Sequence, residues 1–243
     1  MLAAGCGVQE QGTGPGHRMQ SLALSPQQEL QVGHDAFKQI LAKSHVVRSG
    51  PQVDQVERVG RRIAAVVAIE PLMREINLHV TPGEFEWEYA VLESRQINAF
   101  CLPGGKICVY TGLLDVVRND DQLAAVMSHE ISHALAHHIS ERIARERTVG
   151  HGLLSLHYDR QQESEADHIG IFLMTFAGYD PDQAVAFWQE MEAASGPTSM
   201  PAILSDHPSD ASRLRQIQEW IPMAKAAKRA YDEHRIAPLN GRG

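Results

Sequence analysis

The run DQLAAVMSHEISHALAHHISERIARER, residues 121–147, has the periodicity of one long amphipathic helix. Its apolar side chains recur every four residues, at Leu123, Met127, Ile131, Leu135, Ile139 and Ile143. Asn119 or Asp120 can cap its start. His129, Glu130 and His133 lie beside this stripe, so we expect them at the edge of the core, where a cleft could reach them.

Two histidines four residues apart on a helix face the same way, with Cβ atoms about 6 Å apart. That spacing suits two imidazole nitrogens on one Zn²⁺ ion, and the Glu130 between His129 and His133 is placed to act on a water at the metal. A catalytic zinc needs three protein ligands and one open position. The pattern therefore requires a third ligand further along the chain.

The third ligand is expected in the run QESEAD, residues 162–167. Glu163 and Asp167 are four residues apart on a predicted helix from about 160 to 177, so they share one face. Glu163 can complete the zinc site, and Asp167 can accept the free ring N–H of a ligand histidine. Glu165 should point elsewhere. The alternative is that these acids form a solvated helix face, as most acidic clusters do.

The remaining segments follow the order helices, strands, helices, which predicts an α+β fold. Helices are expected at about 26–43 and from 51, and after the central helix at 160–177, from 180 and at about 209–233. Strands are expected at 76–80, around 87–91, and at 96–102 and 106–111 around the turn Pro103-Gly104-Gly105. These strands would form a small antiparallel sheet before the central helix.

Composition limits the function classes. The 243 residues are enough for one good core, and the net charge of −8 argues against nucleic acid as a partner. No run of 18 apolar residues occurs, so no membrane-spanning helix is expected. Residues 1–24 are predicted to be a tether, 25–236 a single domain and 237–243 a tail. Residues 1–6, ending in Cys6, are similar to the end of a bacterial lipoprotein signal, although its basic and apolar regions are missing; a lipid anchor and a chance match both stay open.

Several motifs in order resemble those of the zinc metallopeptidase family that includes the CAAX prenyl protease, the HtpX heat-shock protease, the mitochondrial Oma-type protease and soluble periplasmic relatives. They are Asn98-Ala99-Phe100 with Pro103-Gly104-Gly105, Thr111-Gly112-Leu113-Leu114, the H-E-x-x-H with Ala134-Leu135-Ala136, Glu163-Ser164-Glu165-Ala166-Asp167, Gly178-Tyr179-Asp180-Pro181, and His207-Pro208 with Arg213. The resemblance covers most of the chain from about residue 98.

The resemblance implies a zincin-like gluzincin domain, mostly helical, that holds one Zn²⁺ per chain. His129, His133 and Glu163 would be the ligands and Glu130 the catalytic base. The family commonly has a longer segment before the third ligand than the 29 residues between His133 and Glu163. Either a piece is missing from this chain or the loop is naturally short. The relatives with membrane spans are excluded by composition, so the chain resembles the exported, soluble bacterial branch.

The resemblance implies roles for three further sites whose sequence patterns alone are weak. In exported relatives, a histidine at the place of His207 can occupy the water position on zinc, which implies a fourth, switchable ligand; an isolated His-Pro is otherwise a helix start. Arg213 could contact substrate or the oxyanion, or be surface charge, and Tyr158 could also help the oxyanion. The strand 98–100 (Asn98, Ala99, Phe100) resembles the edge on which gluzincins lay a substrate strand.

Cys101 and Cys108 allow two interpretations. If Gly104 and Gly105 are the two turn residues, the cysteines oppose each other and could form a disulfide in an oxidising compartment. Alternatively they are two small buried hydrophobes, which we favour.

These observations together predict a zinc-dependent endopeptidase that acts on protein or peptide substrates. We expect these substrates to be misfolded or envelope proteins, which the enzyme would cleave in quality control. We expect it in the periplasm or as a membrane-anchored exported lipoprotein, with the membrane reached only through Cys6. The rival is a zinc-binding, chaperone-like protein that His207 keeps proteolytically inactive. A further rival is a helical core in which the motifs are accidental.

Overall fold

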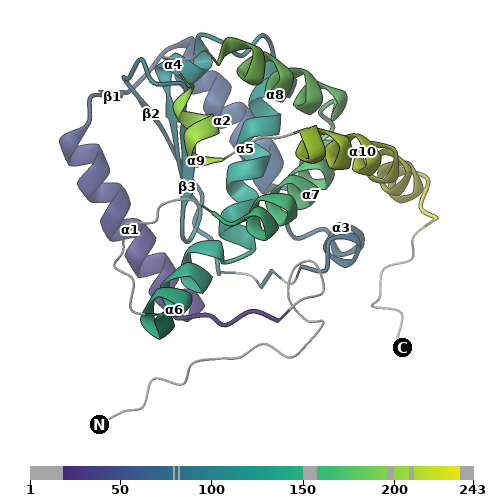
Figure 1. The fold of residues 1–243 in the computed structure, drawn as a ribbon, viewed down its shortest axis with the longest axis horizontal. Coiled ribbons are helices and arrows are strands. Elements are labelled where there is room, and N and C mark those ends of the chain that lie inside the picture. The colour runs from purple at the N-terminus through teal and green to yellow at the C-terminus, as the bar shows by residue number, and fades with distance from the viewer. Residues whose placement is uncertain are drawn as a thin grey trace.

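The computed structural model describes residues 19–78, 80–81, 83–149, 158–195, 200–207 and 211–235. The predicted order of helices, strands and helices is confirmed (Figure 1). The elements are α1 Pro26–Lys43, β1 Val46–Val47, α2 Pro51–Ala64, α3 Glu70–Glu75, β2 Glu88–Leu92, β3 Ala99–Leu102, β4 Lys106–Tyr110, α4 Thr111–Leu114, α5 Asp120–Leu135, α6 His138–Val149, α7 Arg160–Phe176, α8 Asp182–Ala194, α9 Ala202–Asp206 and α10 Ala211–Asp232.

Side chains that accept hydrogen bonds fix where the main helices begin. Ser25 starts α1 through a reciprocal capping box with Gln28. Asn119 accepts from the backbone of the third residue of α5, and Asp159 caps α7. Such caps satisfy N–H groups that have no partner within the helix, which is why these starts could be predicted from the sequence.

The sheet corrects two predictions. Its strand order is β1-β2-β4-β3, and β2 pairs with β4 in parallel, so the sheet is mixed rather than antiparallel. The expected strand at 76–80 is also wrong, because α3 ends in a turn at Ile76 and Asn77, and the Leu78 N–H donates to the Met73 carbonyl at 2.8 Å. Ile76 and Leu78 are both buried by this turn, which mimics the alternation of a strand.

The hairpin of β3 and β4 is present, but its register is one residue away from the predicted one. Leu102 pairs with Lys106, so the loop has three residues, and its Gly104 and Gly105 both take positive φ, at 72° and 87°. Cys101 therefore pairs with Ile107, and Cys108 with Phe100. Paired residues share a face and neighbours alternate, so the two cysteines lie on opposite faces of the sheet, buried and unbridged.

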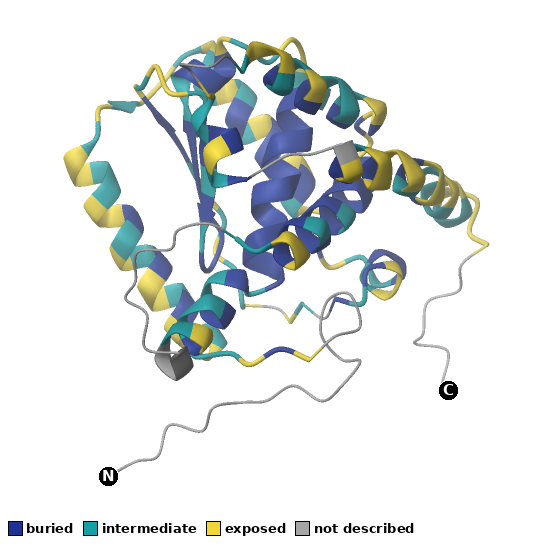
Figure 2. Ribbon diagram, in the orientation of Figure 1, coloured by how far each residue is buried: buried dark blue, intermediate teal, exposed yellow. Residues whose placement is uncertain are grey.

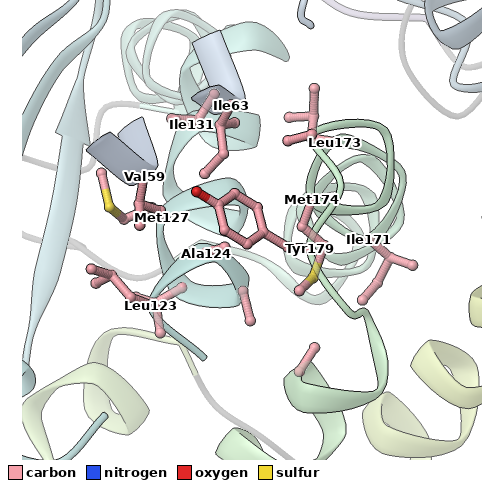
Figure 3. Close-up of a cluster of buried hydrophobic side chains, with 14 of the residues drawn as sticks. Val59, Ile63, Leu123, Ala124, Met127, Ile131, Ile171, Leu173, Met174 and Tyr179 are labelled. Atoms are coloured by element: carbon pink, nitrogen blue, oxygen red, sulfur yellow. The ribbon is translucent and has the colours of Figure 1, made fainter. Parts of the chain in front are cut away.

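Helix α5 runs through the centre of the molecule, between the sheet and α7 (Figure 1), and nearly all of it is buried (Figure 2). The face of the sheet that carries Cys101 packs on this side, and α1 covers the opposite face, which carries Phe100 and Cys108. Figure 3 shows the apolar contact between α5 and its neighbours, made by Met127, Ile131, Leu173, Met174 and others. The core thus holds α5 in a fixed orientation.

The long helix predicted for residues 121–147 is in fact two helices. The prediction of one apolar stripe that runs on to Ile143 is therefore wrong. Helix α5 ends at Leu135, His137 takes a left-handed φ of 54°, and α6 begins at His138. Ile139 and Ile143 therefore belong to another helix. Among the described residues, no helix is long and apolar enough to cross a bilayer. Cys6 and the whole segment 150–157 that precedes α7 lie outside the described residues.

Candidate metal centre

Helix α5 brings the two histidines and the glutamate of the H-E-x-x-H pattern to one buried point. His129, Glu130 and His133 are each 2% exposed or less. The Nε2 atoms of His129 and His133 lie 3.1 Å apart. This is the convergence that a four-residue helical spacing predicts.

Helix α7 supplies the carboxylates. Glu163 Oε2 lies 3.5 Å from His129 Nε2, and Glu163 Oε1 lies 3.6 Å from His133 Nε2. The two helices can approach this closely because Gly170 faces the backbone of His129, where an added Cβ would come within 3.1 Å of the His129 nitrogen. The prediction that Glu163 joins the two histidines in space is therefore correct in geometry.

His207 is a fourth member of the cluster. It follows α9, is 3% exposed, and its Nδ1 lies 2.9 Å from Glu163 Oε1 and 3.2 Å from His129 Nε2. Its Nε2 lies 3.3 Å from Glu130 Oε1. One ligand atom from each of His129, His133, Glu163 and His207 lies within 4.8 Å of the others. The structure thus places His207 inside the site.

This donor set fits a zinc ion. Imidazole nitrogens and a carboxylate oxygen are the ligands of catalytic zinc sites. Two buried acid oxygens, Glu130 Oε1 and Glu163 Oε2, have no hydrogen-bond partner in the described part of the chain. Buried acceptors are normally satisfied, so two acid oxygens without a hydrogen bond beside these donor atoms are what a site completed by a cation and water would leave.

Asp167 and Arg213 brace the cluster from behind. Asp167 Oδ1 lies 2.9 Å from His129 Nδ1, as predicted for a residue that orients a ligand. Arg213 donates to both oxygens of Asp167, at 2.6 and 2.8 Å, and to the His207 carbonyl at 3.1 Å, while its guanidinium stacks over Trp188. Arg213 is only 6% exposed, so its guanidinium is a buried partner of Asp167 and not a surface charge.

The charges in the cluster are strongly coupled. Burial opposes the charge on Asp167, but Arg213 and His129 outweigh it and keep the pKa of Asp167 below its ordinary value. Burial likewise opposes ionisation of Glu163, but the nearby His129 and His207 outweigh it and lower its pKa strongly. Burial lowers the pKa of His133 well below 6.5, so that ring is neutral, as a ligand must be. Burial raises the pKa of Glu130, as suits a base.

Sequence analysis missed the partners of His133 on its outer side. His133 Nδ1 lies 2.9 Å from His138 Nδ1, and His138 Nε2 lies 3.1 Å from Glu165 Oε2. Glu165, which was expected to point away from Glu163 and Asp167, lies outside the metal cluster and is buried beside His138, a partner that was not foreseen. Tyr158 stacks on the His133 ring with centroids 3.7 Å apart. His138 reaches His133 only because the helix breaks between them. The apolar period continues across the break, so no sequence pattern indicated it.

The predicted substrate strand forms the outer edge of the sheet, beside α9. The Asn98 side chain donates to Asp206 at 2.8 Å, and the Ile203 N–H donates to the Ile97 carbonyl at 3.0 Å. Ala99 faces the core shared with α5, whereas Phe100 faces the side covered by α1. Among Asn98, Ala99 and Phe100, the structure therefore brings Asn98 next to the segment that carries His207.

Comparison with known proteins agrees with this geometry. The model of peptidase family M48 matches residues 59–151 and 147–221, which is more than half of the chain. The chain belongs to this family. The match spans the H-E-x-x-H helix, Glu163, His207 and Arg213, so the chain shares with the M48 peptidases the segments that build the cluster.

Three curated relatives illustrate the similarity. The mitochondrial metalloendopeptidase OMA1 of Schizosaccharomyces pombe is 34% identical over 84% of this chain and 64% of its own length. The human mitochondrial metalloendopeptidase OMA1 is 30% identical over 70% of this chain and 39% of its own. The β-barrel assembly-enhancing protease of Escherichia coli is 24% identical over 79% and 43%. The chain thus covers less than two thirds of the length of these relatives.

Proposed function

We propose that this chain is a zinc-dependent endopeptidase that hydrolyses peptide bonds in protein substrates. The observation that carries the proposal is the convergence of His129, His133 and Glu163 at one point, beside Glu130, whose buried Oε1 has no hydrogen-bond partner among the described residues. Membership of a peptidase family supports it. Relatives named as metalloendopeptidases support it as well.

In this mechanism the three ligands hold the metal and Glu130 moves the proton. Zinc supplies Lewis-acid polarisation of the scissile carbonyl and lowers the pKa of the attacking water. Glu130 Oε1 takes a proton from that water and passes it to the nitrogen of the leaving amine. Asp167 keeps the proton of His129 on Nδ1, so that Nε2 presents its lone pair to the site.

The test is a Glu130→Gln variant assayed on unfolded casein. Glutamine keeps the size of the side chain but cannot accept the proton, so we expect zinc to remain bound and cleavage to be lost. Glu233→Gln, at an exposed carboxylate in the turn after α10, is the matched control and should cleave like the parent. Cleavage by Glu130→Gln at the parent's rate would refute the mechanism.

The position of His207 favours a second function, a zinc-binding protein that is held inactive. Its ring lies between Glu130 and Glu163, 3.3 Å from Glu130 Oε1 and 2.9 Å from Glu163 Oε1. We propose that His207 is a fourth ligand that leaves for catalysis. A His207→Ala variant should then cleave casein faster than the parent. If neither protein cleaves casein, although both bind zinc, the chaperone-like function is the better proposal.

We also propose envelope quality control as the setting, with Cys6 as the site of a lipid anchor. The small residues before Cys6 support the anchor, and the name of the Escherichia coli relative supports substrates in β-barrel assembly. The names of the other relatives point instead to mitochondria. Expression of the chain in bacteria behind the basic and apolar regions of a lipoprotein signal, with Cys6 and with Cys6→Ala, tests the proposal, because only the former should fractionate with membranes. An equal distribution of the two would refute the anchor.

A further inference from the structure

The side of the His133 ring that faces away from the metal cluster is occupied by a second histidine. His133 Nδ1 and His138 Nδ1 are 2.9 Å apart, and both rings are buried. On the other side of the second ring, His138 Nε2 lies 3.1 Å from the carboxylate oxygen of Glu165. Three side chains therefore form one continuous line that ends at a candidate zinc ligand.

When His133 binds a metal, only one arrangement of protons allows both hydrogen bonds, from His133 to His138 and from His138 to Glu165. The Nε2 of His133 faces the cluster, so it must carry the lone pair, and the proton of the neutral ring is on Nδ1. His133 then donates from Nδ1, and His138 must accept on its own Nδ1. A neutral His138 consequently holds its proton on Nε2, where the Glu165 carboxylate accepts it.

The break between α5 and α6 makes this contact possible. In a continuous helix, a residue five positions on points about 140° away from the first and could not face it. Here the left-handed His137, with φ 54°, turns α6 back so that His138 lies against His133. A non-glycine residue in that conformation is strained, and such strain is typical of functional sites. The Gln20 side chain holds the break by donating to the Ala136 carbonyl at 2.8 Å.

We propose that His138 and Glu165 are positioning residues, which fix the tautomer and the orientation of His133 so that its Nε2 points at the metal. The inference rests on the proposed zinc site. Metal-binding histidines usually donate their second ring nitrogen directly to a carboxylate or a carbonyl. In this chain His138 lies between the ligand His133 and the carboxylate of Glu165, so Glu165 acts on His133 through His138.

The experiment measures zinc affinity, by competition with a chelator, and the visible spectrum of the Co²⁺-loaded protein, so it does not depend on peptidase activity. His138→Phe removes the acceptor and keeps the ring volume. His138→Asn keeps an acceptor, since its Oδ1 can replace Nδ1. Glu165→Gln leaves a side chain that can donate as well as accept and so no longer selects one tautomer. Glu29→Gln is the control, because it changes the buried partner of the neighbouring His137.

We expect His138→Phe to weaken zinc binding by about 10–100-fold and to alter the Co²⁺ spectrum, as loss of such partners does elsewhere. His138→Asn should restore both. Glu165→Gln should weaken binding in the parent but not in the His138→Asn background, because its effect passes through His138. Glu29→Gln should leave both readouts unchanged. Unfolding curves in EDTA identify any variant that is not folded.

Two results would overturn the inference. One is equal loss of zinc affinity in His138→Asn and His138→Phe, which would mean that packing of the ring matters and its acceptor does not. The other is an equal effect of Glu165→Gln in both backgrounds. If the parent binds no zinc, the inference fails together with the metal site. A protein that shows the expected zinc pattern but cleaves nothing would count against the peptidase proposal alone.

Discussion

Replacement of Arg213 by alanine should destabilise the metal-free protein and not only impair its activity. The side chain is 6% exposed and makes two hydrogen bonds to Asp167 and one to the His207 carbonyl. Its removal leaves Asp167 buried with a partner missing. It also leaves a gap over the ring of Trp188, on which the guanidinium lies at 4.2 Å.

The magnitude follows from the burial of this pair. Removal of one partner of a buried ion pair costs about 3–5 kcal/mol. Asp167 retains His129 as a partner at 2.9 Å, which places the expected cost near the lower limit, about 3 kcal/mol. In a chain of 243 residues, each kcal/mol lowers Tm by about 2–4 °C, so we expect a decrease of about 6–12 °C.

Thermal unfolding followed by circular dichroism in EDTA measures this decrease without any contribution from bound metal. Arg215→Ala, at an exposed arginine of the same helix, is the control and should change Tm by about 2 °C or less. A Tm of Arg213→Ala equal to that of the control, combined with lost casein cleavage, would refute the reasoning. Arg213 would then act on the substrate or the oxyanion instead of bracing Asp167.

Three further perturbations test other parts of the molecule. Gly33→Ala gains up to about 1 kcal/mol of helix propensity, but its Cβ would meet the Pro103 carbonyl oxygen at 1.8 Å. We expect overpacking to prevail with a net loss of about 1–2 kcal/mol, measured by urea unfolding; a more stable variant would refute this. His137 is buried, which lowers its pKa, but the hydrogen bond to Glu29 and the nearby Glu84 outweigh burial and raise that pKa above 6.5. This contribution to stability is full below 6.5 and is lost as pH rises through the folded-state pKa, so the difference in Tm between parent and Glu29→Gln should shrink from pH 6 to pH 9. A difference independent of pH would contradict this. Zinc at about 1,000 times its Kd should stabilise the chain by about 4 kcal/mol relative to EDTA, measured by thermal unfolding, and an unchanged Tm would argue against the site.

The parts of the site that sequence analysis could find are those set by spacing within one helix. His129 and His133 share a face because they are four residues apart, as do Glu163 and Asp167, and the contact of these two helices brings both pairs together. The cap at Asn119 could also be found, because it depends only on neighbouring residues. His207 was proposed as a ligand only through the family resemblance. No local sequence pattern connects it to His129, His133 or Glu163, which lie about 40 or more positions earlier in the chain.

The errors arose where the chain departs from regular geometry. The break at Ala136 and His137 cannot be inferred from an apolar period that continues on both sides of it, so His138 and Glu165 were missed. The hairpin contains a three-residue loop where a two-residue turn was expected, and a shift of one residue moves every following side chain to the other face. The parallel pairing of β2 with β4 depends on a crossover that no strand pattern encodes.

That single shift in the hairpin determines how the protein responds to redox conditions. Cys101 and Cys108 lie on opposite faces of the sheet, so an oxidant cannot join them unless the strands first separate. Burial raises the pKa of the Cys108 thiol to about 12 and that of Cys101 well above 9, which keeps both out of the reactive thiolate form. The hairpin of β3 and β4 therefore does not depend on a disulfide between these two cysteines, in an oxidising or in a reducing compartment.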